Sequence, residues 1–213
     1  MSSLLMRLTK PSITNEPPTQ RELNRNEIAV VITFIFALFL GIGIRNNSIN
    51  NNRDVELGAG LPTISVPANW ITGTSPDYVV SLRNPRGAGI FDTEILVAVQ
   101  PLGENENPVT VRTKLGFQHT QELLRYRELE AVPVTVTVVG VEGVLVTYAY
   151  VADPTREQGA VAPPVVVQAQ DLVFAVNGNA VIVTMAADAA HWDKEETYFD
   201  LVKNSLRVKE GGE

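Results

Sequence analysis

Few side chains in this sequence of 213 residues are suited to catalysis or metal binding, because it holds two histidines and no cysteine. The lack of cysteine excludes thiol nucleophiles, thiolate ligands and disulfides, and two histidines make a histidine-based zinc site hard to assemble. His119 falls within a predicted helix. A general base there would need a nucleophile or an orienting carboxylate, and the sequence indicates neither. We therefore expect His119 to be a hydrogen-bonded, partly buried side chain.

The second histidine, His191, lies near acidic residues that could together ligate a cation: Asp188, Asp193, Glu195 and Glu196. Acidic residues in the first turn of a helix also complement the helix dipole and cap its free N–H groups. Capping is the interpretation that we favour. The sequence thus predicts neither a metal site nor a cofactor at this position.

Familiar catalytic motifs are missing from the sequence. The segment LRNPRGAGIF (82–91) has two glycines but lacks the Gly-Lys-Ser/Thr ending of a phosphate-binding loop, and no G-x-S-x-G pattern occurs. A glycosidase needs a pair of carboxylates that a sequence alone does not reveal. The net charge of −7 has the wrong sign for a surface that binds nucleic acid. We expect a protein that is not an enzyme and has no nucleic-acid partner.

Four side chains are candidates for docking a protein partner: Trp70, Arg83, Arg86 and Trp192. Each tryptophan lies at the end of a predicted strand or the start of a predicted helix. An indole at such a place either packs in the core or at its rim, or serves as a recognition hot spot. Arg83 and Arg86 are the only basic pair in their region, in or beside a hairpin loop that we expect to be exposed.

One apolar run stands apart: residues 28–44, IAVVITFIFALFLGIGI, have no charge and only Thr33 as a polar residue. As a helix these 17 residues would span about 25 Å, at the short end of what a bilayer requires. A cleaved signal peptide and a buried core helix are the alternatives. The preceding 27 residues are too many for a typical signal peptide, and apolar side chains cover every side of the helix. We predict a retained transmembrane anchor at 28–45.

The basic residues on the two sides of this run predict its orientation. Four precede it and two follow it closely, so we expect the N-terminus in the cytoplasm and the C-terminal domain in the periplasm, a lumen or the extracellular space. Residues 46–213 hold 12 basic and 21 acidic residues. Anionic lipid head groups repel such an acidic domain, so its surface is expected to meet a protein or a cation. The alternative is that the charge serves only to keep the domain soluble.

The other segments are a cytoplasmic tail (1–27), a polar, asparagine-rich linker (46–60), a folded domain (61–209) and a short C-terminal tail (210–213). The linker has no periodicity and is expected to serve as a tether.

Within the domain, β-prone runs predict strands in 61–70, 77–85 and 91–102, and helical spacing predicts a helix in 104–131. Two pairs of strands follow. The first, in 132–152, is interrupted at Gly140 and Gly143, and the second, in 165–188, is joined by Asn177-Gly178-Asn179. A last helix is predicted with Asp193 as its N-cap and Glu196 completing a capping box.

The predicted order, β-β-β-α-β-β-β-β-α, lacks the strict alternation of a parallel sheet. It favours an α+β fold, in which an antiparallel sheet of about six to seven strands carries two packed helices, behind one N-terminal transmembrane helix.

Three segments carry a resemblance to a known family. They are ISVPANW (64–70), the central helix leading into a hairpin at VEGV (141–144), and the ending GNAVIVTMAADAAHWDKEETYFDLVKNSLRV (178–208). Over about residues 61–209 the pattern resembles the PsbP/Mog1/DcrB superfamily. The resemblance implies a sheet sandwiched by helices and a role that is not enzymatic, since members are extrinsic subunits or assembly factors of photosynthetic complexes, envelope lipoproteins, or binding partners of other proteins. The chain departs from the family in its uncleaved anchor and in lacking a cysteine to acylate.

These observations favour a single-pass membrane protein whose extracytoplasmic domain is an accessory, stabilising or assembly subunit of a membrane protein complex, with energy-transducing complexes among the candidates. Its expected partners are other subunits of that complex and, through residues 28–44, the bilayer. A membrane-tethered module for a small solute or a cation is the alternative, and it predicts a deep pocket with convergent polar groups. A hydrolase without a recognisable motif would instead place a perturbed carboxylate or histidine in such a pocket.

Overall fold

The computed structural model describes residues 20–49, 51–136, 140–153 and 163–207. The chain forms two compact units, Met1–Ser48 and Ile49–Glu213. The predicted tail at 210–213 and the first 19 residues of the predicted tail at 1–27 lie outside the described residues.

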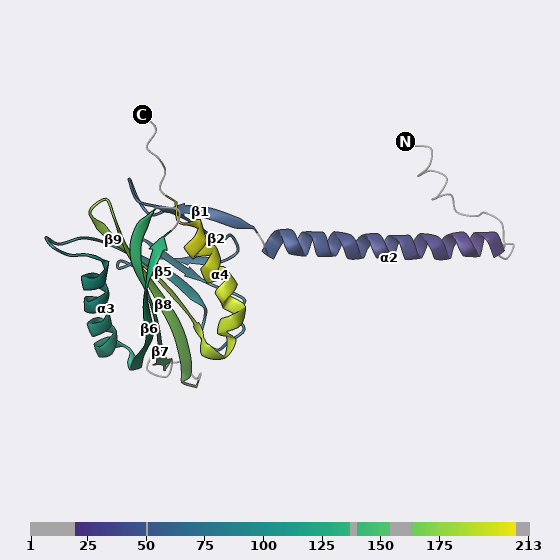
Figure 1. The fold of residues 1–213 in the computed structure, drawn as a ribbon. Helices are drawn as coiled ribbons and strands as arrows, with labels where there is room; N and C mark the ends of the chain where they lie inside the picture. The colour runs from purple at the N-terminus through teal and green to yellow at the C-terminus, as the bar shows by residue number, and fades with distance from the viewer. Residues whose placement is uncertain (1–19, 50, 137–139, 154–162, 208–213) are drawn as a thin grey trace, which may run out of the picture. The chain divides into compact units, whose positions relative to one another are not determined.

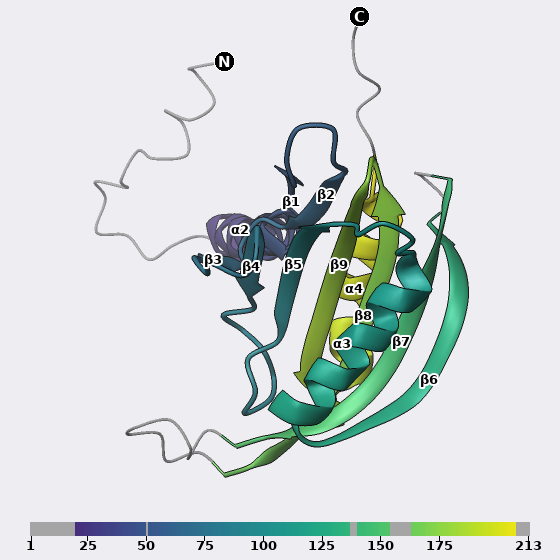
Figure 2. The same cartoon turned by 90° about the vertical axis from the view of Figure 1, so that its left-hand side faces the viewer.

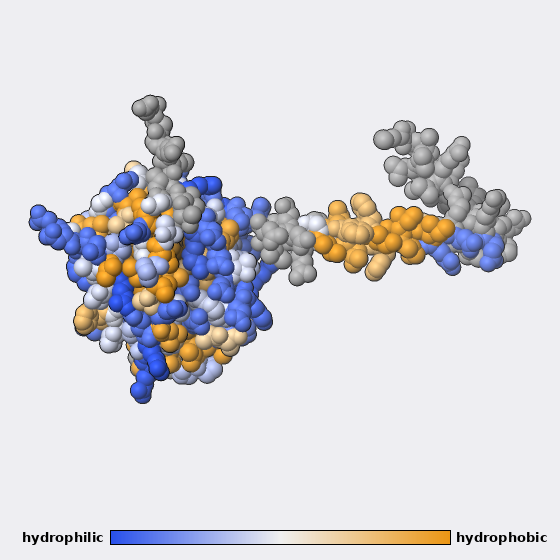
Figure 3. All heavy atoms as spheres, in the orientation of Figure 1, coloured by the Kyte–Doolittle hydropathy of each residue, from blue (hydrophilic) through white to orange (hydrophobic). Residues whose placement is uncertain are grey.

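The first unit is built on the helix α2 (Gln20–Ile49). Its most apolar window, Asn26–Gly43, has a mean hydropathy of 2.1 and buries no side chain. This stretch is hydrophobic on the face drawn in Figure 3. By length and composition α2 can cross a membrane, a test that a signal sequence also passes. The helix begins at Gln20, so the described part of the predicted tail, residues 20–27, is helical.

The second unit is an α+β domain around a seven-stranded antiparallel sheet in the order β3-β4-β5-β9-β8-β7-β6 (Figure 1). The strands of this sheet are β3 (Ile71–Gly73), β4 (Val80–Arg83), β5 (Glu94–Pro101), β6 (Leu124–Val136), β7 (Val141–Ala152), β8 (Val165–Val176) and β9 (Asn179–Asp188). The predicted class, sheet type and strand number are confirmed.

A separate antiparallel hairpin, two helices and a short 3-10 helix complete the domain. They are β1 (Asn52–Glu56), β2 (Thr63–Pro67), α3 (Pro108–Glu122), η2 (Ala189–His191) and α4 (Trp192–Ser205). Helix α3 covers one face of the sheet and α4 the other, as Figure 2 shows. The hairpin lies beside α4, where the backbone N–H of Ser65 donates to Ser205 Oγ at 2.8 Å.

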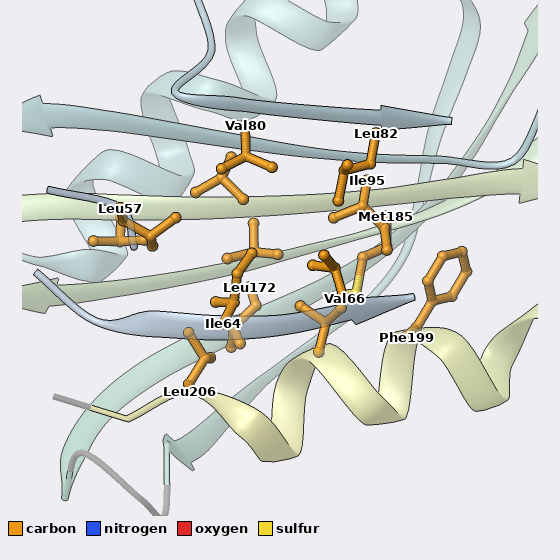
Figure 4. Packing of buried hydrophobic residues seen from close by; sticks show 14 of the residues in the cluster. Leu57, Ile64, Val66, Val80, Leu82, Ile95, Leu172, Met185, Phe199 and Leu206 are labelled. Carbon is orange, nitrogen blue, oxygen red and sulfur yellow. The ribbon is translucent and has the colours of Figure 1, made fainter. Parts of the chain in front are cut away.

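The main core lies between the sheet, α4 and the β1–β2 hairpin (Figure 4). Because side chains alternate along a strand, one set of residues in β5 and β9 points to α4 and the other to α3. Ile95, Met185 and Phe199 have no exposed surface. Burial of this kind is the main force that holds α4 on the sheet.

The turn between β8 and β9 matches its prediction. Asn177 and Gly178 have φ angles of 47° and 73°, as a two-residue type I′ hairpin turn requires. Gly143, in contrast, is not in a turn. It lies inside β7, where a Cβ atom would come within 2.7 Å of the Val173 carbonyl oxygen of the neighbouring strand.

Three sequence predictions are wrong. The helix predicted in 104–131 ends at Glu122, and residues from Leu124 onward form β6, because Arg125 has a φ of 58° that no helix continues and the segment pairs with β7. The predicted linker contains β1, whose polar residues gain their order from pairing with β2. Helix α4 begins at Trp192, so Asp193 is not its N-cap; Asp188 instead caps η2.

Candidate functional site

A buried polar cluster lies between α3 and the sheet, with the Asp171 carboxylate at its centre. Asp171 is 1% exposed. Its Oδ1 atom accepts hydrogen bonds from Thr184 Oγ1 at 2.7 Å and from the Tyr148 hydroxyl at 3.2 Å. Its Oδ2 atom lies 3.6 Å from His119 Nδ1. The cluster therefore joins β7, β8 and β9 to the C-terminal half of α3.

Burial determines the protonation of this cluster. It raises the pKa of Asp171 from 3.8 to about 7, against the hydrogen bonds from Thr184 and Tyr148 that favour the carboxylate. It lowers the pKa of His119 from 6.5 to about 4. Because desolvation disfavours the charged form of each group, His119 is neutral at pH 7 and the two side chains do not form an ion pair.

Aromatic rings surround the His119 imidazole. The ring of Tyr148 lies 4.8 Å from it and that of Tyr126 lies 5.5 Å from it. Tyr148 also stacks on Tyr150 at 6.3 Å, and Tyr150 meets Phe91 edge to face at 6.4 Å. These rings form a continuous row across the α3 face of the sheet.

The cluster supplies the carboxylate partner that the sequence did not reveal for His119. The burial predicted for His119 is confirmed, since its side chain is 14% exposed, while the 3.6 Å contact with Asp171 is longer than a hydrogen bond. Because the pKa of Asp171 is near 7, its carboxyl group can stay protonated close to neutral pH beside the neutral imidazole of His119. Asp171 is nevertheless enclosed by the sheet and α3, so in this structure the pair fastens α3 rather than facing a substrate.

Asp188 binds backbone N–H groups on two segments, and His191 lies beside it. Asp188 Oδ1 accepts from the N–H of Ala190 at 3.0 Å, and Oδ2 accepts from the N–H of Ile90 at 3.3 Å. His191 Nδ1 lies 3.7 Å from Asp188 Oδ2. Capping is thus the role of Asp188, and no group of three potential metal ligands occurs in the described part of the chain.

The structure places the four docking candidates in two different environments. Trp70 is 3% exposed and packs edge to face on Tyr198 at 5.4 Å, while Trp192 is 6% exposed and lies 5.0 Å from the ring of Phe199. Both indoles belong to the core, so the docking hypothesis is corrected for Trp70 and Trp192: buried rings offer no contact surface.

Arg83 and Arg86 do lie on the surface, at one end of the loop 84–93. Arg83 Nη1 is 3.3 Å from Asp92 Oδ2, and both side chains are more than half exposed. The loop itself is fixed by buried contacts, because Asn84 Nδ2 donates to Glu195 Oε2 at 3.0 Å and Asp188 binds Ile90. Docking through the two arginines stays a prediction.

Open grooves lie along β6 and α3 in the described part of the chain. Two lie on either side of β6, and both are lined by Val134 and Thr135: one of about 260 Å³ faces α4, and one of about 400 Å³ faces the start of α3. The third, of about 190 Å³, lies between α3 and β6 beside Phe117 and Tyr126. His119 and Asp171 do not line any of these three grooves.

Comparison with known proteins identifies the fold. No family model and no curated protein sequence matches the chain. Among solved structures, cyanobacterial PsbP (CyanoP) from Synechocystis is similar at a TM-score of 0.50 and 17% identity, over 75% of this chain and 94% of that one. LpqN of Mycobacterium tuberculosis, described as involved in cell envelope biogenesis, is similar at 0.50 and 12%, over 74% and 90%.

The Ran-binding protein Mog1p of Saccharomyces cerevisiae is also similar, with a TM-score of 0.48 and 13% identity over 74% of this chain and 95% of that one. At such low identities a structural likeness describes the fold alone. The α+β domain that follows α2 has a PsbP-like fold.

Proposed function

We propose that the chain is a single-pass membrane protein whose PsbP/Mog1-like domain lies outside the cytoplasm and is a non-enzymatic accessory, stabilising or assembly subunit of a membrane protein complex. The observation that carries the proposal is the short length of chain that connects α2 to the domain. The apolar helix α2 ends at Ile49, and the first strand of the domain begins at Asn52. So short a connection keeps the domain near the bilayer that α2 would cross.

Tethering of this kind favours weak docking. A domain held at the membrane meets the other membrane proteins at a high effective concentration, so a modest interface is enough for stable association. The fold neighbours are consistent with such a role: one is a PsbP, one is described as involved in cell envelope biogenesis, and Mog1p is a Ran-binding protein. The acidic surface of the domain favours a protein partner over anionic lipid.

Single-cysteine labelling tests the predicted topology, because the natural chain has no cysteine of its own. Gln20→Cys places a thiol before the apolar window and Glu104→Cys places one in the domain, and both natural side chains are exposed. In intact cells or sealed spheroplasts, a membrane-impermeant maleimide should label the Glu104→Cys chain. The Gln20→Cys chain should react only after the membrane is opened.

The same experiment checks whether α2 is retained. Both variants should stay in the membrane fraction after carbonate washing and keep the full mass of the chain. Labelling of Gln20→Cys in intact cells, or release of a shortened domain, would contradict the proposed anchor.

A further inference from the structure

Half of the α3 face of the sheet has no helix over it. Figure 2 shows α3 crossing β7 and β8, with β4 and β5 left uncovered. Burial along β5 agrees with this view, because Ile95 and Val97 on the α4 side are completely buried while Glu94 and Leu96 on the other side are only half-buried. The part of this face around Glu94 and Leu96 is therefore only partly covered.

Aromatic and acidic side chains gather at one end of that face. We name it the aromatic–acidic surface and define it by five residues: Tyr78, Phe91, Glu94, Glu122 and Tyr150. Phe91 and Tyr150 are in edge-to-face contact at 6.4 Å. Burial, and after it the charge of Glu94, raises the pKa of both Tyr78 and Tyr150.

Small residues lie in the sheet between Glu94 and Tyr148. In the sheet register, Glu94 of β5 pairs with Ala186 of β9, Ala186 pairs with Ala169 of β8, and Ala169 pairs with Tyr148 of β7. The two alanines are buried. Tyr150, one step further along its face of β7, meets Phe91 beside them.

The Glu94 carboxylate lacks a close partner. Within the described residues no donor bonds to it, and Arg83, the one cation that acts on it, is paired with Asp92 at 3.3 Å. Burial raises the pKa of Glu94, which means that the ionised carboxylate is incompletely compensated. The charge of Glu122, at the end of α3, also raises the pKa of Tyr78. With Glu94 and Glu122 as their charged members, the five residues that define the surface carry a net negative charge.

The faces of aromatic rings attract cations, and a neighbouring carboxylate strengthens the attraction. A guanidinium or ammonium group on this surface would contact tyrosine and phenylalanine rings and pair with Glu94. Two exposed apolar side chains offer further contact to a peptide: Val79, next to Tyr78, and Ile90, next to Phe91, are 56% and 53% exposed.

We propose that the aromatic–acidic surface docks a basic segment of a partner protein, with an arginine or lysine side chain held between the rings and Glu94. The inference rests on the accessory function proposed above and adds the position and chemistry of the interface.

Photo-crosslinking in native membranes tests the surface with the full chain. A photoreactive phenylalanine analogue replaces Ile90 at the edge of the surface or, as the matched control, Val109 at the start of α3, which is 57% exposed. Adducts should form from position 90 and not from position 109. Mass spectrometry should place them on a segment of another protein that contains arginine or lysine.

The charge is tested by Glu94→Gln, with Glu104→Gln, at an exposed glutamate outside the surface, as the control. The first variant should lower the adduct yield from position 90 about three- to tenfold, and the second should leave it unchanged. Trp fluorescence, which reports the folded domain, should be the same for both.

Equal adduct yields from positions 90 and 109 would overturn the inference. So would adducts on a segment without basic residues or on a second copy of this chain. An adduct yield that Glu94→Gln does not change would overturn it as well. If the chain is shown to join a complex while any of these is found, the accessory function stands and only this interface is wrong. A chain that travels alone, without adducts, contradicts both.

Discussion

Replacing His119 with glutamine should make the domain lose stability as the pH rises from 4 to 7, and replacing Asp171 with asparagine should make it gain stability over nearly the same range. The two side chains are neighbours, 3.6 Å apart, but burial shifts their pKa values in opposite directions. Each variant removes one of two opposing effects.

The sign of each effect depends on whether the folded or the unfolded chain binds the proton more tightly. Asp171 has a pKa of about 7 in the folded domain against an ordinary 3.8, so the unfolded chain releases this proton at lower pH and stability falls as the pH rises through that window. His119 has a pKa of about 4 against an ordinary 6.5, so the unfolded chain takes up a proton first as the pH falls, and stability is lost below 6.5.

In the natural chain the two effects nearly cancel between pH 4 and 6.5. The Asp171 effect is worth about 4 kcal/mol when complete and the His119 effect, reduced by the partial exposure of its ring, about 2–3 kcal/mol, so the difference in slope between the variants should be large. Urea unfolding at several pH values measures it. Tryptophan fluorescence follows the domain alone in the full chain in mild detergent, because Trp70 and Trp192 both lie in its core.

A control variant separates this pair from the rest of the titrating groups. Glu104→Gln changes an exposed carboxylate and should leave the pH profile of the natural chain unchanged. If His119→Gln and Asp171→Asn both kept the natural pH profile, the buried cluster would not have the electrostatics described here.

Replacing Phe199 with alanine should lower the free energy of unfolding by about 3–5 kcal/mol, a large part of the stability of an ordinary domain. Phe199 is completely buried, and its ring contacts Trp192 where α4 meets the sheet. The change removes apolar contact and leaves a cavity that the surrounding strands cannot close. The same urea experiment measures the loss.

Phe117→Ala is the matched control, because it makes the same chemical change on the outer side of α3, where the phenylalanine is 68% exposed. Its expected effect is below about 0.5 kcal/mol. Similar losses for the two variants would mean that α4 is not packed on the sheet as the structure has it.

The sequence predicts this fold where a strong local signal exists. Asn177-Gly178 between two apolar runs identifies a hairpin because a type I′ turn needs two residues with positive φ. The C-terminal helix is found from Phe199, Val202 and Leu206, whose spacing places them on one face. These elements carry their own stabilising interactions.

Other elements depend on partners that are distant in the sequence. Strand β1 is polar and β3 has three exposed residues, so neither shows the pattern of a buried strand. Residues after Leu123 retain helical spacing, but pairing with β7 decides their conformation. Here tertiary contacts override local preference.

The buried cluster shows the same limit at the level of a site. Its signal in the sequence is Asp171, a single acidic residue inside the apolar run VVVQAQDLVFAV of β8. A buried acid needs partners. Only the fold brings His119, Tyr148 and Thr184 to it, from one helix and two other strands.

The measurement that tests the central claim most directly is extraction of native membranes in mild detergent, followed by native separation and quantitative mass spectrometry of what travels with the chain. The proposed accessory role predicts co-migration with a large membrane assembly at a fixed stoichiometry that survives a second separation. A chain that migrates alone, at its own mass of 23.2 kDa plus bound detergent, would contradict it.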